Sequence, residues 1–158
     1  MLELSLTSLD DTRRFAEVLA SVLRDGDVVL LDGEMGAGKT TTTKLLASCL
    51  GVTDDVTSPT YTLVHTYMGG RLTLHHADLY RLKSTSEIDD LGLEEMMSQG
   101  GVLLIEWGAP AGPHFPDHLF VSFKLRAGDV RTVTVASKSE NWRGRIIQIG
   151  EALQDLVD

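Results

Sequence analysis

The sequence predicts an α/β domain in which helices flank a central, mixed and partly parallel β-sheet. Three observations lead to this prediction. Segments of helical periodicity alternate with segments of strand character along the 158 residues. The runs 28–31 and 102–105 are apolar throughout, as expected of strands buried on both faces. No linker-like stretch or internal repeat interrupts the alternation, so residues 1–158 are predicted to form a single domain.

The first half of the chain contains two predicted helices separated by a buried strand. Ser8 is a candidate N-cap for the first helix, with Asp11 three residues later as its capping-box partner. Gly26 is predicted to end this helix, whose apolar residues recur at helical spacing: Phe15, Val18, Leu19, Val22 and Leu23. After the buried strand, a glycine-rich turn leads into a second helix from about Lys39 to near Gly51.

The second half of the chain predicts strands that alternate with helical segments. Residues 60–67 and 71–76 form a predicted hairpin around Gly69-Gly70, a dipeptide typical of two-residue turns. The remaining predicted elements are a short helical region at 86–97, the buried strand at 102–105, an alternating strand at 119–125, a return strand at 133–135 after a Gly128-Asp129 turn, and a closing helix from about Trp142 to Leu156.

The charge balance of the chain is acidic. Asp and Glu number 23 against 14 Lys and Arg, for a formal net charge of −9. Such a surface repels a polyanion, which disfavours extensive direct contact with nucleic acid. One acidic stretch is typical of a solvated helix face and is alternatively a docking surface for a basic partner: Glu87, Asp89, Asp90, Glu94 and Glu95.

Three features bear on the cellular compartment. No apolar run approaches the ~18 residues that a membrane helix needs. The N-terminal residues Met1 to Leu4 lack the basic region of a secretory signal. The single cysteine, Cys49, has no partner for an internal disulfide, which agrees with a reducing environment. We therefore expect a cytoplasmic protein that is not associated with a membrane.

Residues 33–40 match the phosphate-loop pattern G-x-x-x-x-G-K-[ST] at every fixed position, between a predicted strand and a predicted helix. Glycines at 33, 36 and 38 allow backbone angles that direct successive N–H groups towards phosphate oxygens. The N-terminus of the following helix adds partial positive charge at the same place. Lys39 is expected to reach the β- and γ-phosphates, and the Thr40 hydroxyl to bind Mg²⁺. The sequence therefore predicts a nucleoside triphosphate site.

Two acids are candidates to complete the magnesium site, which in such proteins needs a carboxylate at the end of a neighbouring strand. Glu106 ends the apolar run 102–105, and Asp78 follows the strand that carries His76. The alternatives are a solvated strand-end acid for Glu106 and a turn cap before Leu79 for Asp78. If both line the site, one binds the metal ion while the other orients the attacking water.

Ser58 and Thr60 lie between the phosphate-loop helix and the next strand, where a switch-like segment that senses the γ-phosphate is expected. A plain turn set by Pro59 is the alternative. A zinc site is disfavoured, because no cysteine accompanies the candidate ligands and their spacing matches no standard site: His65, His75, His76 and Asp78.

Four segments together resemble the TsaE (YjeE) family, small P-loop ATPases of bacterial tRNA threonylcarbamoyladenosine synthesis. They are GEMGAGKTT at 33–41, SPTYTLV at 58–64, HADLYRL at 76–82 and IEW at 105–107. The last three motifs, in this order and spacing, are far more specific than the phosphate loop. The resemblance implies a P-loop NTPase-like sheet and a Mg²⁺-dependent ATPase that is slow alone and acts on a TsaB–TsaD heterodimer, supporting its turnover. Transfer RNA, modified at adenosine 37, is then met only through that complex.

The resemblance also implies roles for individual residues. Lys39, Asp78 and Glu106 are the implied catalytic residues, and Thr40 with Glu106 would hold Mg²⁺. ATP and ADP would be bound by the loop together with two more distant residues: Gly33, Met35, Gly36, Ala37, Gly38, Lys39, Thr40 and Thr41, with Thr12 and Arg131. The segment 108–116 departs from the family pattern, because Gly108-Ala109-Pro110 stands where the family often has an acidic residue.

Other classes of protein share the phosphate loop. A small-molecule or nucleoside kinase is the alternative function, but it needs a lid with several arginines, and the nine arginines here are scattered. A GTPase needs an N-K-x-D segment, whereas Asn141 is the sole asparagine and precedes Trp142. A non-catalytic, nucleotide-dependent binding module ranks after the kinase.

Overall fold

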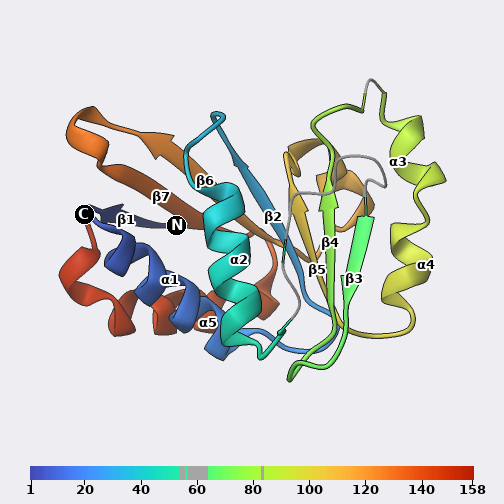
Figure 1. The fold of residues 1–158 in the computed structure, drawn as a ribbon, viewed down its shortest axis with the longest axis horizontal. Helices are drawn as coiled ribbons and strands as arrows, with labels where there is room; N and C mark the ends of the chain where they lie inside the picture. The colour runs from blue at the N-terminus through green and yellow to red at the C-terminus, as the bar shows by residue number, and fades with distance from the viewer. Residues whose placement is uncertain (54–55, 57–63, 83) are drawn as a thin grey trace.

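A single mixed sheet forms the centre of the computed structural model, which describes residues 1–53, 56, 64–82 and 84–158 (Figure 1). Within these residues its strand order is β1-β7-β6-β2-β5-β4-β3. Strand β2 is parallel to both β5 and β6, β4 is parallel to β5, and the remaining pairs are antiparallel. The strands are β1 (Leu2–Leu6), β2 (Val28–Gly33), β3 (Val64–Tyr67), β4 (Leu74–Asp78), β5 (Val102–Glu106), β6 (Leu119–Leu125) and β7 (Arg131–Ala136). The predicted partly parallel sheet is confirmed.

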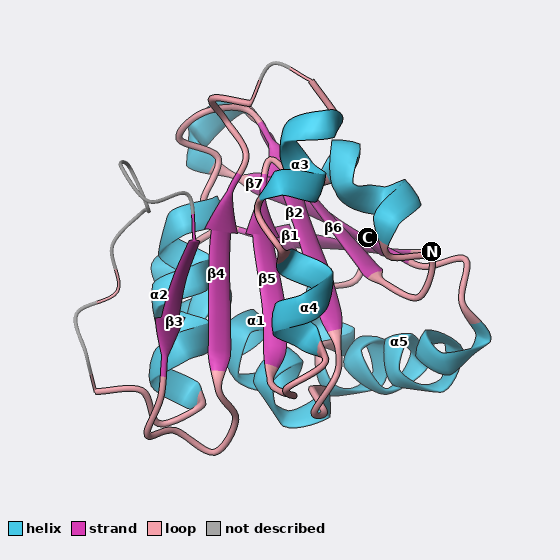
Figure 2. Cartoon of the chain, turned by 90° about the vertical axis from the view of Figure 1, so that its right-hand side faces the viewer, coloured by secondary structure: helices cyan, strands magenta, loops and turns pink. Residues whose placement is uncertain are grey.

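Helices cover both faces of the sheet (Figures 1 and 2). One face packs against α1 (Leu9–Val22), α2 (Lys39–Cys49) and α5 (Glu140–Ala152), with α1 in contact with the other two. The opposite face packs against α3 (Ser86–Asp90), α4 (Leu93–Met97) and the 3₁₀ helix η1 (Ala109–His114). Two further 3₁₀ turns, η2 (Ala127–Asp129) and η3 (Gln154–Leu156), lie in the C-terminal part.

The central strand β2 shows why its sequence is apolar without interruption. Val29 and Leu31 belong to the core under α1, α2 and α5, whereas Val28 and Leu30 belong to the core under α3, α4 and η1. Because successive side chains of a strand point to opposite faces, burial on both sides requires an apolar residue at every position. This arrangement places the carboxyl end of β2, and the loop after it, at the end of a central strand whose two faces are both buried.

The N-terminal helix begins as predicted. The Ser8 side chain accepts a hydrogen bond from the Asp11 amide at 3.1 Å. The Asp11 carboxylate bonds the amide and hydroxyl of Thr7, both at 2.9 Å, rather than the Ser8 amide that a capping box would use. The helix ends at Val22, earlier than the predicted stop at Gly26.

The hairpin of β3 and β4 is confirmed as an antiparallel pair, but its predicted two-residue turn is wrong. The connection spans residues 68–73 because tertiary contacts hold it against the helices. The Arg71 amide donates to the Leu50 carbonyl, and its guanidinium donates to the Ala20 carbonyl, both at 2.6 Å. One backbone hydrogen bond to Leu50 and one side-chain hydrogen bond to Ala20 thus hold a longer connection in place of a tight turn.

Two other differences concern short elements. The helical region at 86–97 is divided into α3 and α4 at Gly92, whose φ of 67° is left-handed and interrupts a helix. Strand β1 was not predicted, although Leu2, Leu4 and Leu6 alternate with polar residues. It pairs with β7, which lies at the other end of the sequence.

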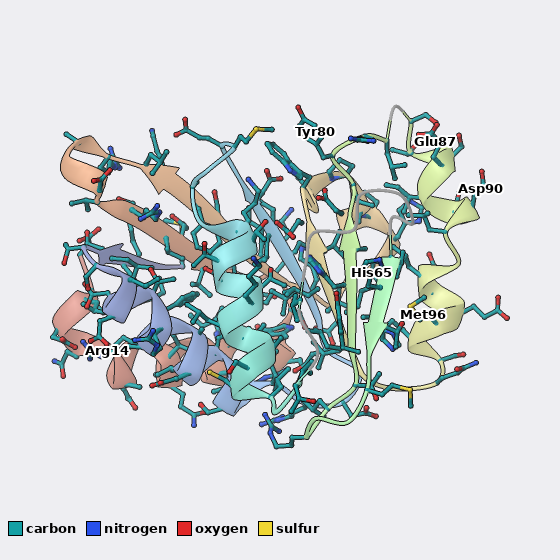
Figure 3. The ribbon with its side chains drawn as sticks, viewed as in Figure 1. Arg14, His65, Tyr80, Glu87, Asp90 and Met96 are labelled. Atoms are coloured by element: carbon teal, nitrogen blue, oxygen red, sulfur yellow. The ribbon has the colours of Figure 1, made fainter. Side chains whose placement is uncertain are left out.

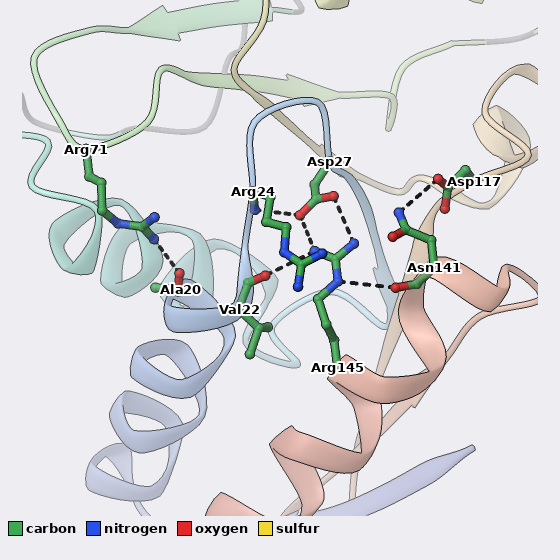
Figure 4. A network of polar contacts seen from close by, with 8 residues as sticks. All are labelled: Ala20, Val22, Arg24, Asp27, Arg71, Asp117, Asn141 and Arg145. Carbon is green, nitrogen blue, oxygen red and sulfur yellow. Dashed lines mark hydrogen bonds and ion pairs between the residues drawn. The ribbon is translucent and has the colours of Figure 1, made fainter.

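A buried polar network at the amino end of β2 joins the surrounding helices (Figure 4). Arg145 of α5 donates to both carboxylate oxygens of Asp27, at 2.5 and 3.1 Å, and to the Val22 carbonyl at 3.0 Å. Its guanidinium also lies 3.6 Å from the ring centroid of Trp142. The network fixes α5 and the end of α1 to the start of the central strand. No helix in the described part of the chain combines the length and apolar character needed to cross a bilayer.

Candidate nucleotide and metal site

The loop between β2 and α2 has the backbone geometry that a phosphate-binding loop requires. Gly33, Gly36 and Gly38 have φ values of 133°, 80° and 114°, which L-amino acids with side chains rarely adopt. A Cβ atom on Gly33 would lie 2.3 Å from the Phe123 carbonyl oxygen, so the end of β2 approaches β6 too closely for any side chain. The loop leads directly into the N-terminus of α2 at Lys39 (Figure 1).

Lys39 lies inside this loop with its ammonium group buried. The ammonium donates to the carbonyl oxygens of Gly33 and Glu34, the latter at 2.9 Å. It also lies 3.9 Å from the ring centroid of Trp107. Burial lowers the pKa of Lys39, and the negative charges of Glu106 and other nearby acids oppose that shift. A buried cation is therefore held at the centre of the loop, close to where phosphates are expected.

Thr40 and Glu106 meet at the start of α2, as their predicted shared role requires. The Thr40 hydroxyl donates to Glu106 Oε1 at 2.8 Å. Glu106 Oε2 accepts from Nε2 of His76 at 2.6 Å, and the Glu106 side chain is only 2% exposed. Glu106 is thus a buried carboxylate at the end of β5, so its interpretation as a solvated strand-end acid is wrong.

Asp78 lies beside Glu106, because β4 and β5 are parallel neighbours and these residues pair in register. Its Oδ1 accepts from the Tyr80 amide at 3.0 Å, so the predicted turn-cap role is present. Asp78 also lines the same pocket as Glu106. Asp78 therefore caps the turn and also lies in the pocket, which contains two carboxylates at the ends of adjacent strands. Its role towards a metal ion or a water molecule stays a prediction.

The pocket gathers most of the predicted site residues, together with Trp107, which follows Glu106, and with Tyr80. Its lining is Met35, Gly36, Gly38, Lys39, Thr40, Thr41, Asp78, Tyr80, Glu106 and Trp107. Tyr80 was not predicted as a site residue. Its ring centroid lies 5.2 Å from that of Trp107, and Figure 3 shows it at the end of the sheet near the loop. The signal that could have identified Tyr80 is its place two residues after Asp78, on the same strand-end turn.

Some predicted site residues lie away from this lining. Thr12 is buried in α1, where its hydroxyl donates to the Ser8 carbonyl at 3.3 Å, and it is not among the pocket residues of the described chain. The Arg131 side chain passes 3.4 Å from the position of a Cβ on Gly38. ATP contacts of Thr12 and Arg131 remain predictions. Ser58 and Thr60 lie outside the described residues.

The chemistry of the pocket suits a Mg²⁺ ion and a triphosphate. Mg²⁺ prefers oxygen ligands, and Thr40, Glu106 and Asp78 provide a hydroxyl and two carboxylates at one edge of the pocket. A polyphosphate needs cations and N–H donors, which Lys39 and the glycine loop supply. In addition, Nε of Arg131 is buried and has no hydrogen-bond partner within the described part of the chain. Such an unpaired donor beside the loop is available to an anionic ligand.

The acidic stretch on α3 and α4 lies apart from this pocket. Figure 3 shows Glu87 and Asp90 directed outwards from α3, as expected of a solvated face. Asp89 and Glu94 instead lie near Nδ1 of His114, at 3.2 and 3.4 Å. Part of the acidic surface is therefore used within the chain, where it connects α3 and α4 to η1.

Comparison with known proteins supports both the fold and the resemblance. The family model of the threonylcarbamoyl adenosine biosynthesis protein TsaE matches residues 6–134. The chain is 42% identical over 130 residues to the tRNA threonylcarbamoyladenosine biosynthesis protein TsaE of Treponema pallidum (strain Nichols), covering 82% of this chain and 96% of that protein. It is 42% identical over 120 residues to the protein of the same description from Bacillus subtilis (strain 168), covering 76% and 75%. The crystal structure of Bacillus subtilis YdiB superposes with a TM-score of 0.80 at 30% identity, covering 95% of this chain and 94% of that one.

Proposed function

Because this chain belongs to the TsaE family, whose members take part in tRNA threonylcarbamoyladenosine biosynthesis, we propose that it is the Mg²⁺-dependent ATPase of that system. The observation that carries the proposal is the contact between Thr40 and Glu106 at the entrance to the phosphate loop. A hydroxyl and a carboxylate in this relation form the magnesium-binding pair of P-loop NTPases.

The pocket residues have different proposed roles in ATP hydrolysis. Lys39 and the loop amides bind the β- and γ-phosphates, and Thr40 with Glu106 holds the metal ion. Mg²⁺, when bound, neutralises part of the phosphate charge and polarises the γ-phosphoryl group. Asp78 or Glu106 orients a water molecule whose oxygen bonds to the γ-phosphorus while the bond to the β–γ bridging oxygen breaks. The products are ADP and inorganic phosphate.

We further propose that hydrolysis is coupled to a TsaB–TsaD complex, on which this protein acts to support turnover. Two large side chains on the pocket lining are exposed: Met35 is 67% and Tyr80 56% accessible. Exposed apolar groups beside a nucleotide site support a partner surface that changes with the bound nucleotide. The net charge of −9 supports contact with tRNA only through the complex.

The test measures ATP hydrolysis with Mg²⁺, alone and with purified TsaB–TsaD complex. We expect slow hydrolysis by the protein alone and stimulation by the complex. Lys39→Ala is the inactive comparison, and Lys44→Ala, which removes an exposed lysine from the same helix, is its matched control. ATP binding without any response to the complex would contradict the coupling and would favour the kinase alternative, for which transfer of phosphate to added nucleosides would then be measured.

A further inference from the structure

The carboxylate of Glu106 is buried and has a contact that the proposed chemistry does not by itself explain. Oε1 faces the Thr40 hydroxyl, whereas Oε2 accepts from Nε2 of His76 at 2.6 Å. His76 is completely buried and is not part of the pocket lining within the described residues. A buried carboxylate must be compensated by hydrogen bonds, and His76 provides one of them to Glu106.

Strand register explains how His76 reaches this position. On β4, His76 pairs with Leu104 of β5, and Asp78 pairs with Glu106. Residues two apart on a strand share a face, so His76 lies on the same face as Glu106 and one step further from the strand ends. The core residues Leu74 and Leu104 lie on this face as well. His76 therefore connects the hydrophobic core to the carboxylate of the site.

The hydrogen-bond pattern indicates what the imidazole contributes. Because a carboxylate oxygen only accepts hydrogen bonds, Nε2 of His76 carries the donated proton. Nδ1 is buried and has no hydrogen-bond partner among the described residues. An unpaired buried nitrogen costs stability, which an apolar side chain in this place would avoid. The contribution of the ring is therefore the N–H group that it directs at Glu106.

We infer that His76 is a positioning residue that holds Oε2 of Glu106, so that Oε1 stays directed at Thr40 and the metal position. This inference rests on the proposed ATPase function. Partners of metal-binding carboxylates fix the orientation of the ligand and thereby its affinity for the ion.

The experiment compares three variants of the full chain. His76→Leu removes the N–H group, and His76→Gln retains a donor of similar reach. His75→Leu is the matched control, because His75 is the next residue of β4 but bonds Thr66 and Gly100 instead, at 3.0 and 3.1 Å. Affinity for a non-hydrolysable ATP analogue is measured by calorimetry with Mg²⁺ and with EDTA. The kcat and KM for ATP and the thermal midpoint are recorded alongside.

We expect His76→Leu to reduce the Mg²⁺-dependent gain in affinity by about tenfold, with little change in EDTA and a fall in kcat larger than the change in KM. We expect His76→Gln to retain most of the Mg²⁺-dependent gain in affinity. His75→Leu retains all of this gain, even if the thermal midpoint of that variant is lower. A full gain in His76→Leu, or an equal loss in both leucine variants, would overturn the role of His76. If His76→Leu does not fold, His76→Asn replaces it, since its amide is one methylene shorter than that of Gln. Equal gains for Asn and Gln would then overturn the role.

These outcomes separate the inference from the proposed function. A wild-type protein that shows no Mg²⁺-dependent gain and no hydrolysis overturns the proposed function together with the role of His76. A normal wild-type protein with an unaffected His76→Leu variant overturns the role of His76 alone.

Discussion

The two ends of strand β2 carry buried charged groups in contrasting states. At the amino end, Asp27 receives both hydrogen bonds of a bidentate pair from Arg145 and a third bond from the Arg24 amide at 2.7 Å. The guanidinium also donates to the Val22 carbonyl (Figure 4). It lies over the ring of Trp142 as well. This network is closed, because each charge finds its partners within the fold.

At the carboxyl end, the charged groups face a pocket. Lys39 donates to two carbonyl groups of its own loop, and Glu106 accepts from the hydroxyl of Thr40; all three residues line the pocket. Beside the loop, Nε of Arg131 has no hydrogen-bond partner within the described residues. The difference teaches that burial of charge alone does not identify a functional site. Buried charged groups that line a pocket are a better indication of a functional site, because a ligand bound there can supply further partners for them.

The largest effect on stability is expected from a substitution that breaks the network around Asp27. Arg145→Met leaves Asp27 buried without its counter-charge, and we expect the free energy of unfolding to fall by about 3–5 kcal/mol. Urea unfolding at neutral pH measures it, with Arg143→Met on the exposed side of the same helix as control. ATP affinity measured on the folded variant stays unchanged. A loss of ATP affinity without a loss of stability would contradict the division between the two ends.

Lys39→Ala changes the pocket at the carboxyl end of β2, and we expect it to affect ligand binding more than stability. We expect ATP affinity to fall by about a hundredfold, because two charge-assisted phosphate contacts are lost. We expect the free energy of unfolding to fall much less than in Arg145→Met, since burial lowers the pKa of Lys39 and so already disfavours its charged form in the fold. Calorimetric titration and urea unfolding of the same samples test both statements. A variant that unfolds readily would show that the loop depends on Lys39 for stability.

Glu106→Gln tests the carboxylate without removing its shape. The amide retains an oxygen acceptor but loses the charge that the metal ion needs, so we expect hydrolysis to fall by about tenfold or more. ATP binding remains measurable by titration. Glu95→Gln, an exposed acid on α4, is the control. Unchanged turnover in Glu106→Gln would exclude the role assigned to Glu106.

The smallest effect concerns an exposed pair that belongs to neither end. Arg14 donates two hydrogen bonds of 2.8 Å to Asp155 and holds the pKa of that carboxyl below its usual 3.8. A lowered pKa stabilises the fold above the unfolded value, and the contribution disappears as pH falls through the folded value. Asp155→Asn therefore lowers the urea midpoint slightly at pH 7, and this difference shrinks as the pH falls below the usual pKa of 3.8. High salt reduces the difference, because exposed pairs are screened. A difference that grows on acidification would contradict the sign.

Local patterns predicted much of the fold correctly. The apolar runs at 28–31 and 102–105 are buried strands, and Ser8 caps the first helix. Two of the errors concern elements that take part in contacts with distant residues, whereas the division of the helical region at Gly92 has a local cause. Arg71 is drawn to Ala20 and Leu50, so the hairpin connection opens, and β1 is a strand because β7 lies beside it. The contacts of Arg71 are not visible in a window of neighbouring residues, whereas the alternation of Leu2, Leu4 and Leu6 in β1 is a local signal that was missed.

The sequence by itself determined the phosphate loop, because glycine freedom, the lysine and the flanking periodicities are local properties of the chain. It also supplied both acids as strand-end candidates. Only the tertiary structure decided which groups meet: Thr40 and Glu106 are 66 residues apart, His76 and Glu106 are 30 apart, and Asp27 and Arg145 are 118 apart. Such pairs depend on strand order and register, which the packing of the whole sheet selects and no single segment encodes.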